Sequence, residues 1–246
     1  MTLLLILGSS IAGGLGAVLL AGTVLVVNAS LMDRALPRLI SFSTGALLGA
    51  ALLGMVPHAA EVLPVSTVTL VVLGSLILFF VLEKLLVWRH CHKNDCDVHA
   101  NSGPLLLVGD AFHNFVDGVV IAGAFLNSTP LGITVALSTI AHEVPQELGE
   151  YMVYLHSGYT RRRALFLNCV TSLTSVVGAV IGYFFLSQMR AAGPYLLAFA
   201  AAGFLYVALA DLVPAQRGRM SLGLTSLDLL LVVAGIGVIA LVAQGH

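Results

Sequence analysis

Four polar side chains recur at one-turn spacing inside an otherwise apolar stretch of the sequence. Asp110, His113, Asn114 and Asp117 lie within VGDAFHNFVDGVVIAGAFL, which covers residues 108–126. At about 100° per residue, a helix would place all four within an arc of roughly 100° on one face. Imidazole and carboxylate groups gathered in this way can bind a divalent cation or relay protons.

A second stretch, STIAHEVPQELGEYMVY at residues 138–154, carries the same residue types. Pro145 lies among its polar residues and cannot donate a hydrogen bond to the carbonyl of Ala141, so we expect a kink and a freed carbonyl there. The polar residues would share an arc of about 140° on one helix face: they are His142, Glu143, Gln146, Glu147 and Glu150.

Neither stretch contains a Lys or Arg to neutralise its carboxylates. Clustered charges within a membrane need a counter-ion or a cargo, and neutral imidazole with carboxylate oxygens suits Zn²⁺, and also Fe²⁺, Mn²⁺ or Cd²⁺. Proton relay is the alternative, and both can operate because metal binding displaces protons. Scattered hydroxyls such as Ser172, Thr174 and Ser175 are more simply explained as helix–helix hydrogen bonds.

The composition indicates that these stretches lie in a lipid bilayer. Of the 246 residues, 59% are hydrophobic and only 9% are charged, whereas a soluble domain has about 25% charged residues. The mean hydropathy is +1.02. A formal net charge of -1 with no basic arm argues against a nucleic-acid partner.

Recurring apolar runs predict an all-α polytopic membrane protein with eight transmembrane helices and a single domain over residues 1–246. Each run must be helical, because a lipid-facing backbone has to satisfy its own hydrogen bonds. The first run lacks the positive start of a signal peptide and is expected to remain as a span. The predicted spans are roughly 3–28, 37–60, 66–88, 104–127, 130–156, 164–188, 194–213 and 224–243.

The eleven basic residues separate cleanly between the two sides of an eight-helix arrangement. Only Arg190 falls on one side, and by the positive-inside rule the opposite side, which carries all the others, is cytoplasmic. Both termini are then extracytoplasmic. The ten cytoplasmic basic residues are Arg34, Arg38, Lys84, Arg89, Lys93, Arg161, Arg162, Arg163, Arg217 and Arg219.

Two motifs resemble the signatures of the ZIP (Zrt/Irt-like) family of divalent-metal transporters. HNFVDG (113–118) resembles the helix-four signature, and HEVPQE (142–147) resembles the helix-five signature HExPHE. GALLGAALLGMVPHAAE (45–61) and AAGFLYVALADLVP (201–214) also resemble family segments. The resemblance implies a 3+2+3 helix arrangement, zinc uptake into the cytoplasm by alternating access, an inner (cell) membrane location and a homodimer.

The resemblance further implies two adjacent metal sites that share Asp117 as a bridging carboxylate. One site would be formed by His113, Asp117, His142 and Gln146. The neighbouring site would be formed by Asn114, Asp117, Glu143 and Glu147. Gln146 stands where the signature has His, and because a neutral amide is a weaker ligand, we expect one firm site and one weak site.

Other ionisable residues are candidates for the approach and the exit of an ion. His58 and Glu61, near the outer end of the second span, would form a capture site, or else an exposed pair without a role. Asp110 and Glu150 would line the exit route. The loop at about 89–103 combines thiol and imidazole groups, which favour zinc, although a polar tether is the alternative; these residues are His90, Cys91, His92, Cys96 and His99.

An intramembrane zinc metalloprotease is the main enzymatic alternative, because HEVPQ matches the first half of HExxH. Such a protease needs a second His four residues after the first, and this chain has Gln146 there. A proton- or sodium-coupled carrier without a metal role is a further alternative, against which the imidazoles and loop thiols count. The sequence therefore predicts a transporter and not an enzyme.

Overall fold

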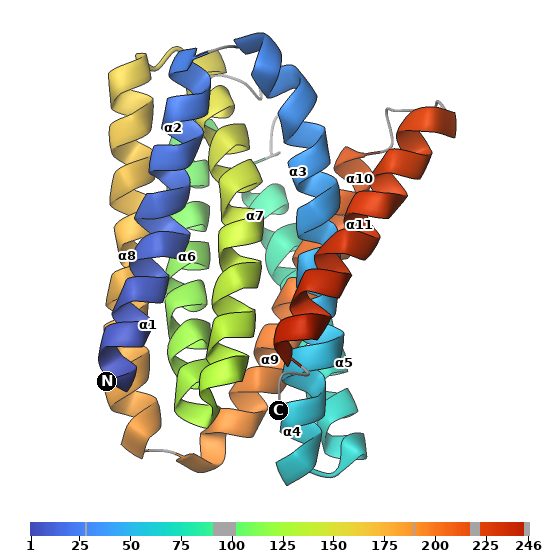
Figure 1. Ribbon diagram of the computed structural model, residues 1–246. Coiled ribbons are helices and arrows are strands. Elements are labelled where there is room, and N and C mark those ends of the chain that lie inside the picture. Colours follow the sequence, from blue (N-terminus) through green and yellow to red (C-terminus); the bar gives the residue numbers. More distant parts are fainter. Residues whose placement is uncertain (28, 91–101, 189, 217–221, 244–246) are drawn as a thin grey trace.

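The computed structural model describes residues 1–27, 29–90, 102–188, 190–216 and 222–243 (Figure 1). Every regular element within these residues is a helix. The long uninterrupted helices are α5 (Val65–His90), α6 (Ser102–Asn127), α7 (Thr129–His156), α8 (Arg161–Gln188) and α11 (Leu222–Ala243). The described part of the chain is thus a bundle of helices joined by short connections.

The other helices are divided by π-helical turns, which the sequence pattern did not predict. η1 (Ala12–Gly16) joins α1 (Thr2–Ile11) to α2 (Ala17–Val27), and η2 (Ala50–Met55) joins α3 (Ala29–Gly49) to α4 (Val56–Val62). η3 (Arg190–Ala192) is a short 3₁₀ turn that precedes α9 (Gly193–Tyr206). The third π-helical turn, η4 (Val207–Leu212), joins α9 to α10 (Val213–Ala215). Extra residues of this kind are frequent where a helix serves function.

Six of the described segments are long and apolar enough to cross a membrane. α6 and α7 are also long enough to cross, with 26 and 28 residues, but they are the two helices that carry the clustered ionisable side chains. The six segments are Thr2–Leu20, Leu36–Val62, Val65–Leu85, Arg161–Gln188, Gly193–Ala210 and Ser226–Ala243.

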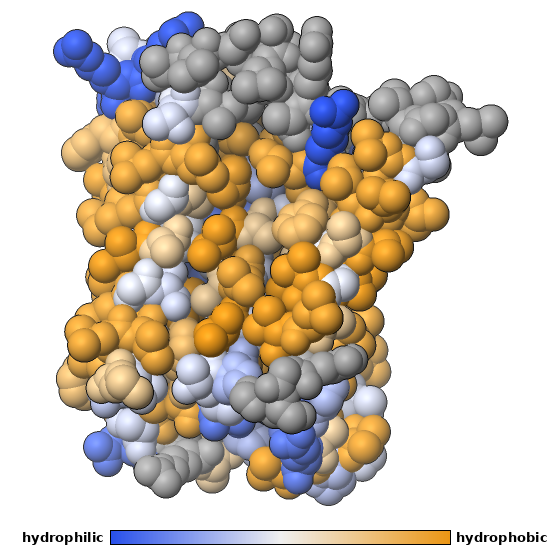
Figure 2. Space-filling view, in the orientation of Figure 1, coloured by the Kyte–Doolittle hydropathy of each residue, from blue (hydrophilic) through white to orange (hydrophobic). Residues whose placement is uncertain are grey.

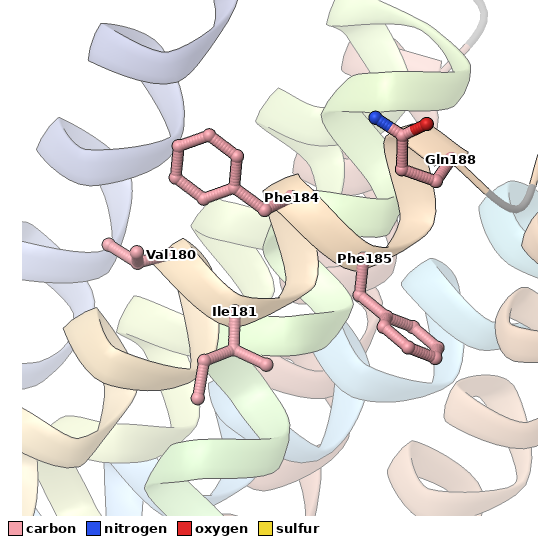
Figure 3. Close-up of a pocket in the computed structure, with 5 residues that line it drawn as sticks. All are labelled: Val180, Ile181, Phe184, Phe185 and Gln188. Carbon is pink, nitrogen blue, oxygen red and sulfur yellow. The ribbon is translucent and has the colours of Figure 1, made fainter.

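The surface has the polarity expected of a protein embedded in lipid. Figure 2 shows apolar residues over the middle of the molecule and hydrophilic residues toward its upper and lower ends. A shallow hollow on α8 is part of the apolar surface, and among its side chains only that of Gln188 is polar (Figure 3). The hollow has no ionisable group, so it offers an ion no ligand of the kind described below.

The helices pack most closely within two groups, which stand side by side in Figure 1. The first group contains α6, α7 and α8, and the second contains α3 and α11. In the first group, a Cβ added to Gly118 of α6 would lie 1.8 Å from the Ser175 carbonyl oxygen of α8. In the second, a Cβ added to Gly45 of α3 would lie 2.0 Å from the Val232 carbonyl oxygen of α11. Glycine permits such close backbone contact between membrane helices. A third close approach is that of Gly14 in η1, where an added Cβ would lie 2.8 Å from the Ser172 carbonyl oxygen of α8.

Hydroxyl groups connect the two groups of helices across α3 and α7. α7 passes through Pro145 without a break, and the carbonyl of Ala141 accepts a hydrogen bond from Ser43 of α3. The Ser138 hydroxyl donates to the carbonyl of Ala46 at 3.3 Å. The expectation of a freed carbonyl at Ala141 is thus matched by a partner on the neighbouring helix.

Helix boundaries follow the predicted spans except at the start of the second one. That span was predicted from residue 37, whereas α3 begins at Ala29. Hydropathy marks the apolar part of a helix, and the preceding turns contain Asp33 and Arg34. The helix therefore starts before its apolar section.

Candidate metal centre

Four ionisable side chains from α6 and α7 converge at one point between these helices. The Nε2 atom of His142 lies 3.2 Å from Oδ2 of Asp117 and 3.2 Å from Nε2 of His113. Oε1 of Glu143 lies 3.4 Å from Nε2 of His113. One ligand atom from each of the four residues lies within 4.8 Å of the others. We refer to His113, Asp117, His142 and Glu143 as the histidine cluster.

The spacing of these atoms suits a small divalent cation. In a tetrahedral zinc site with ligand bonds of about 2.0–2.1 Å, neighbouring ligand atoms are separated by roughly 3.3 Å. The separations between ligand atoms around the two imidazoles range from 3.2 to 4.0 Å, so a modest contraction would bring the atoms into coordination distance. Two nitrogens with two carboxylate oxygens is also a donor set that zinc accepts.

The backbone fixes the orientation of His142 for this role. Its Nδ1 atom lies 2.9 Å from the carbonyl oxygen of Ser138, one turn earlier on α7. Donation from Nδ1–H to that carbonyl leaves Nε2 unprotonated and directed at the cluster, which is the tautomer that a metal requires. Phe204 of α9 packs edge-on against the same ring, with centroids 5.6 Å apart. His142 is therefore held from two sides.

The carboxylates of the cluster have only imidazoles beside them to balance their charge. Oδ2 of Asp117 and Oε1 of Glu143 lie near imidazole nitrogens, and apart from these contacts the two oxygens and Oε2 of Glu143 are buried without a hydrogen-bond partner among the described residues. The sequence from 101 to 160 contains no Lys or Arg. Unpaired carboxylates away from water carry a large free-energy cost, and a bound cation would remove it.

The four side chains differ in their exposed fractions. The side chains of Asp117, His142 and Glu143 are at most 4% exposed, whereas that of His113 is 25% exposed. Three members of the cluster are therefore enclosed by the protein, and His113 lies at its edge.

The residues predicted for a neighbouring site are close by but differently engaged. The Asn114 amide donates to Oδ1 of Asp110 at 2.8 Å, and the Gln146 amide donates to Oε1 of Glu150 at 3.3 Å. Glu147 accepts a 2.7 Å hydrogen bond from the hydroxyl of Ser172 on α8. Glu143 lies with the two histidines and Asp117, whereas the Gln146 amide is bonded to Glu150; the division of these residues into two sites stays a prediction.

The remaining predicted residues lie elsewhere or outside the described residues. His58 is half-buried in α4, where its Nδ1 atom contacts the carbonyl of Gly54 at 2.9 Å, and Glu61 on the same helix is exposed. His90 ends α5, but its side chain is outside the described residues. Cys91, His92, Cys96 and His99 are also outside them, so the prediction for this loop stays a prediction.

Sequence reasoning did not identify two residues that contact the cluster, Ser138 and Phe204, or the partner of Glu147 beside it, Ser172. Ser138 precedes His142 by four residues, so its carbonyl could have been expected beneath the imidazole. Ser172 fits the general prediction of helix–helix hydrogen bonds, but its partner Glu147 could not be read from local spacing. Phe204 comes from a distant part of the chain, and no local pattern connects it to His142.

The fold and the cluster define an integral, multi-pass helical membrane protein with a buried histidine–carboxylate group of the kind that binds divalent metals. Residues 88–243 match the family model described as ZIP zinc transporter. The chain belongs to this family, whose members are transporters and not enzymes.

Individual relatives agree with the family assignment. The chain is 30% identical over 217 residues to zinc transporter YKE4 of Saccharomyces cerevisiae, covering 74% of this chain and 62% of that protein. It is 38% identical over 112 residues to human zinc transporter ZIP4, covering 46% and 17%. It is 32% identical over 140 residues to zinc transporter foi of Drosophila melanogaster, covering 56% and 20%. The chain thus spans less than two thirds of the length of each of these relatives, and about a fifth of the length of ZIP4 and foi.

Proposed function

We propose that this protein transports divalent metal cations, with zinc as the substrate, and that the histidine cluster binds the ion during transport. The observation that carries the proposal is the convergence of two imidazoles and two carboxylates from α6 and α7 within 4.8 Å. The absence of Lys and Arg from residues 101 to 160 supports it, and so does membership of a family of zinc transporters. Fe²⁺, Mn²⁺ and Cd²⁺ suit the same donors.

We further propose eight spans, formed by the six apolar segments together with α6 and α7. The chain from 1 to 246 then forms one transmembrane domain with both termini outside the cytoplasm. Zinc would enter the cytoplasm across the cell (inner) membrane by alternating access, in which the two groups of helices move relative to each other. The contacts from Ser43 and Ser138 to backbone carbonyls lie where such groups would meet. Assembly as a homodimer remains a prediction from the family resemblance.

Uptake of radiolabelled Zn²⁺ into proteoliposomes tests the function and the cluster together. Wild-type protein is compared with His113→Ala and Asp117→Ala, and with Glu83→Gln as a control for loss of a carboxylate on α5, outside the cluster. We expect uptake to fall at least tenfold in the two cluster variants and to persist in the control. Full uptake by both cluster variants would refute the assignment of these residues.

The same vesicles distinguish the alternatives. Failure of the wild type to take up any divalent cation, together with movement of protons or sodium, would favour a carrier without a metal role. Peptide cleavage that depends on Glu143 would favour a protease. Competition by Fe²⁺, Mn²⁺ and Cd²⁺ against Zn²⁺ gives the order of preference.

A further inference from the structure

The row of acidic side chains on α7 ends at a buried tyrosine. Tyr154 shares one face of the helix with three acidic residues, within an arc of about 60° at about 100° per residue: they are Glu143, Glu147 and Glu150. The three acidic residues are at most 8% exposed, and Tyr154 is 0% exposed. An ion that left the histidine cluster along this face, toward the end of α7, would therefore meet the ring of Tyr154.

α6 carries a parallel row of polar side chains that ends in the same way. Asn114 and Asp110 precede Asp117 at one-turn spacing, and Leu107 stands one turn before Asp110. Asn114 and Asp110 are 1% and 3% exposed. Leu107 is half-buried and packs in the same hydrophobic cluster as Tyr154. Both polar rows thus end at one apolar cluster.

This cluster joins α6, α7 and α8 and is separate from the main hydrophobic core. It lies where α7 ends and α8 begins, at the upper end of Figure 1. Tyr154 and Ala164 are 0% exposed, and Leu107 and Tyr159 pack against the cluster that they form. The rings of Tyr154 and Tyr159 meet edge to face, with centroids 5.6 Å apart. We refer to Leu107, Tyr154, Tyr159 and Ala164 as the tyrosine plug.

The turn after α7 holds Tyr159 against Tyr154. The Tyr159 N–H donates to the Tyr154 carbonyl and the Gly158 N–H to the Leu155 carbonyl, both at 3.0 Å, which is the bond pair of a Schellman motif. Gly158 has a φ of 84°, in the left-handed region that favours glycine. The Arg163 guanidinium lies 4.9 Å from the centroid of the Tyr159 ring, a favourable cation–π contact. The plug is thus closed from the side of the α7–α8 connection.

The buried hydroxyl of Tyr154 favours a closed arrangement that can open. Tyrosines at a membrane interface place their hydroxyl among the polar headgroups, whereas the hydroxyl of Tyr154 is buried and has no hydrogen-bond partner among the described residues. A buried hydroxyl without a partner costs free energy, which is recovered when the group meets water. The closed plug is therefore destabilised by one polar atom relative to an open one.

We propose that the tyrosine plug is the cytoplasmic gate of the ion path, with Tyr154 as its central residue. The proposal rests on the proposed function, because a gate requires ions that cross between α6 and α7. An apolar constriction excludes water and so closes a path to hydrated ions without blocking it permanently. Separation of Tyr154 from Leu107 and Tyr159 would open the two polar rows to the cytoplasm.

The reaction rate of a cysteine placed behind the plug measures whether the gate is closed. Glu150→Cys is introduced into a chain whose own three cysteines are changed to Ser, and inside-out membrane vesicles are treated with a membrane-impermeant, positively charged thiol reagent. This parent should react slowly. Tyr154→Ala should raise the rate at least about tenfold, because water and reagent then reach residue 150. Tyr154→Phe should react no faster than the parent, because it keeps the ring and removes the unpaired hydroxyl.

Further variants separate opening of the gate from general loosening of the protein. Phe125→Ala removes a ring that is 5% exposed, in the main core near the other end of α6, and should react at the rate of the parent. Tyr159→Ala removes the packing partner of Tyr154 and should raise the rate, but less than Tyr154→Ala does. Right-side-out vesicles should react slowly in every variant.

An unchanged rate in Tyr154→Ala would overturn the gate, and if that variant does not fold, an unchanged rate in Tyr159→Ala would do so. An equal rise in Phe125→Ala, or a rise confined to right-side-out vesicles, would also overturn it. The proposed function fails differently, by absence of Zn²⁺ uptake in the wild type. In that case, control of access to residue 150 by Tyr154 would still support the gate.

Discussion

His142 is the most constrained ligand of the histidine cluster. The Ser138 carbonyl fixes its tautomer, Phe204 covers its ring, and Asp117 lies 3.2 Å from its metal-binding nitrogen. The contacts from Ser138 and Phe204 lie outside the cluster, and contacts of this kind orient a metal-binding side chain before the metal arrives. They hold His142 in the orientation that the proposed coordination requires.

Zinc affinity is expected to fall steeply as pH falls, because each imidazole must be neutral to bind a metal. At pH values low enough to protonate both imidazoles of the metal-free protein, zinc must displace two protons to bind. The affinity should then fall by up to about 100-fold for each further pH unit, a factor of ten for each proton. His113→Ala leaves one imidazole, so its limiting slope should be about tenfold per pH unit. Titration against a competing chelator at several pH values measures both slopes, and equal slopes would show that His113 is not a ligand.

Local spacing in the sequence gives part of the arrangement at the residue scale. His113 and Asp117 are one turn apart on α6, and His142 and Glu143 are consecutive residues of α7. Local spacing could not tell which of Glu143 and Gln146 approaches the imidazoles, because that depends on the rotation of α7 against α6. In the structure Gln146 instead donates to Glu150, a choice set by packing.

At the scale of helices, Pro145 and Ser43 act as a matched pair. Proline removes the donor for the carbonyl of Ala141, and Ser43 of α3 supplies one in its place. Neither residue alone reveals the connection in the sequence, since the partners are far apart along the chain. The π-helical turns were not predicted for a different reason. Their residues are as apolar as those of a regular helix, so hydropathy does not distinguish them.

A double-mutant cycle tests this pair. Ser43→Ala should destabilise the protein by about 1–3 kcal/mol, because a buried carbonyl loses its donor. In a Pro145→Ala background the helix can supply its own N–H, so Ser43→Ala should cost about 1 kcal/mol less. Unfolding in mixed micelles gives the free energies. Thr69→Ala provides the control, because this hydroxyl bonds to carbonyls of its own helix. Additive effects of Ser43→Ala and Pro145→Ala would contradict the pairing.

The contact between α6 and α8 should tolerate no side chain at Gly118. Valine there would meet the Ser175 carbonyl and force the helices apart, at a cost of about 1–3 kcal/mol or more. Because Asp117 is the adjacent residue, Zn²⁺ binding should weaken together with thermal stability. Gly74→Val on α5, where a Cβ has nothing within 4 Å, should change neither, and calorimetry measures both quantities. If Gly118→Val is destabilised but binds zinc as the wild type does, the contact between α6 and α8 does not position the histidine cluster.

At the scale of the whole molecule, the proposed topology places the two ends of α7 on opposite sides of the membrane. In Figure 1, α1 begins and α11 ends toward the lower end of the molecule, and the start of α8 with its arginines lies at the upper end. Charge distribution was the only sequence signal for this arrangement, and it is a property of the complete chain that no single motif carries.

Cysteine labelling in intact cells tests this topology. In a background with Cys91, Cys96 and Cys169 changed to Ser, a membrane-impermeant maleimide should label Asn127→Cys without permeabilisation. Ser66→Cys, at the start of α5, should behave in the same way. Arg162→Cys should react only after permeabilisation, since its side is predicted to be cytoplasmic. Labelling of Arg162→Cys in intact cells would contradict the proposed orientation.

The unequal exposure of the four ligands separates two properties that a carrier must control. Under the proposed function, the buried Asp117, His142 and Glu143 would set the equilibrium strength with which an ion is held. His113 is one quarter exposed and would be the ligand at which an ion enters or leaves the cluster. Changes at the buried three should therefore appear mainly in affinity, and changes at His113 in the rate of ion exchange.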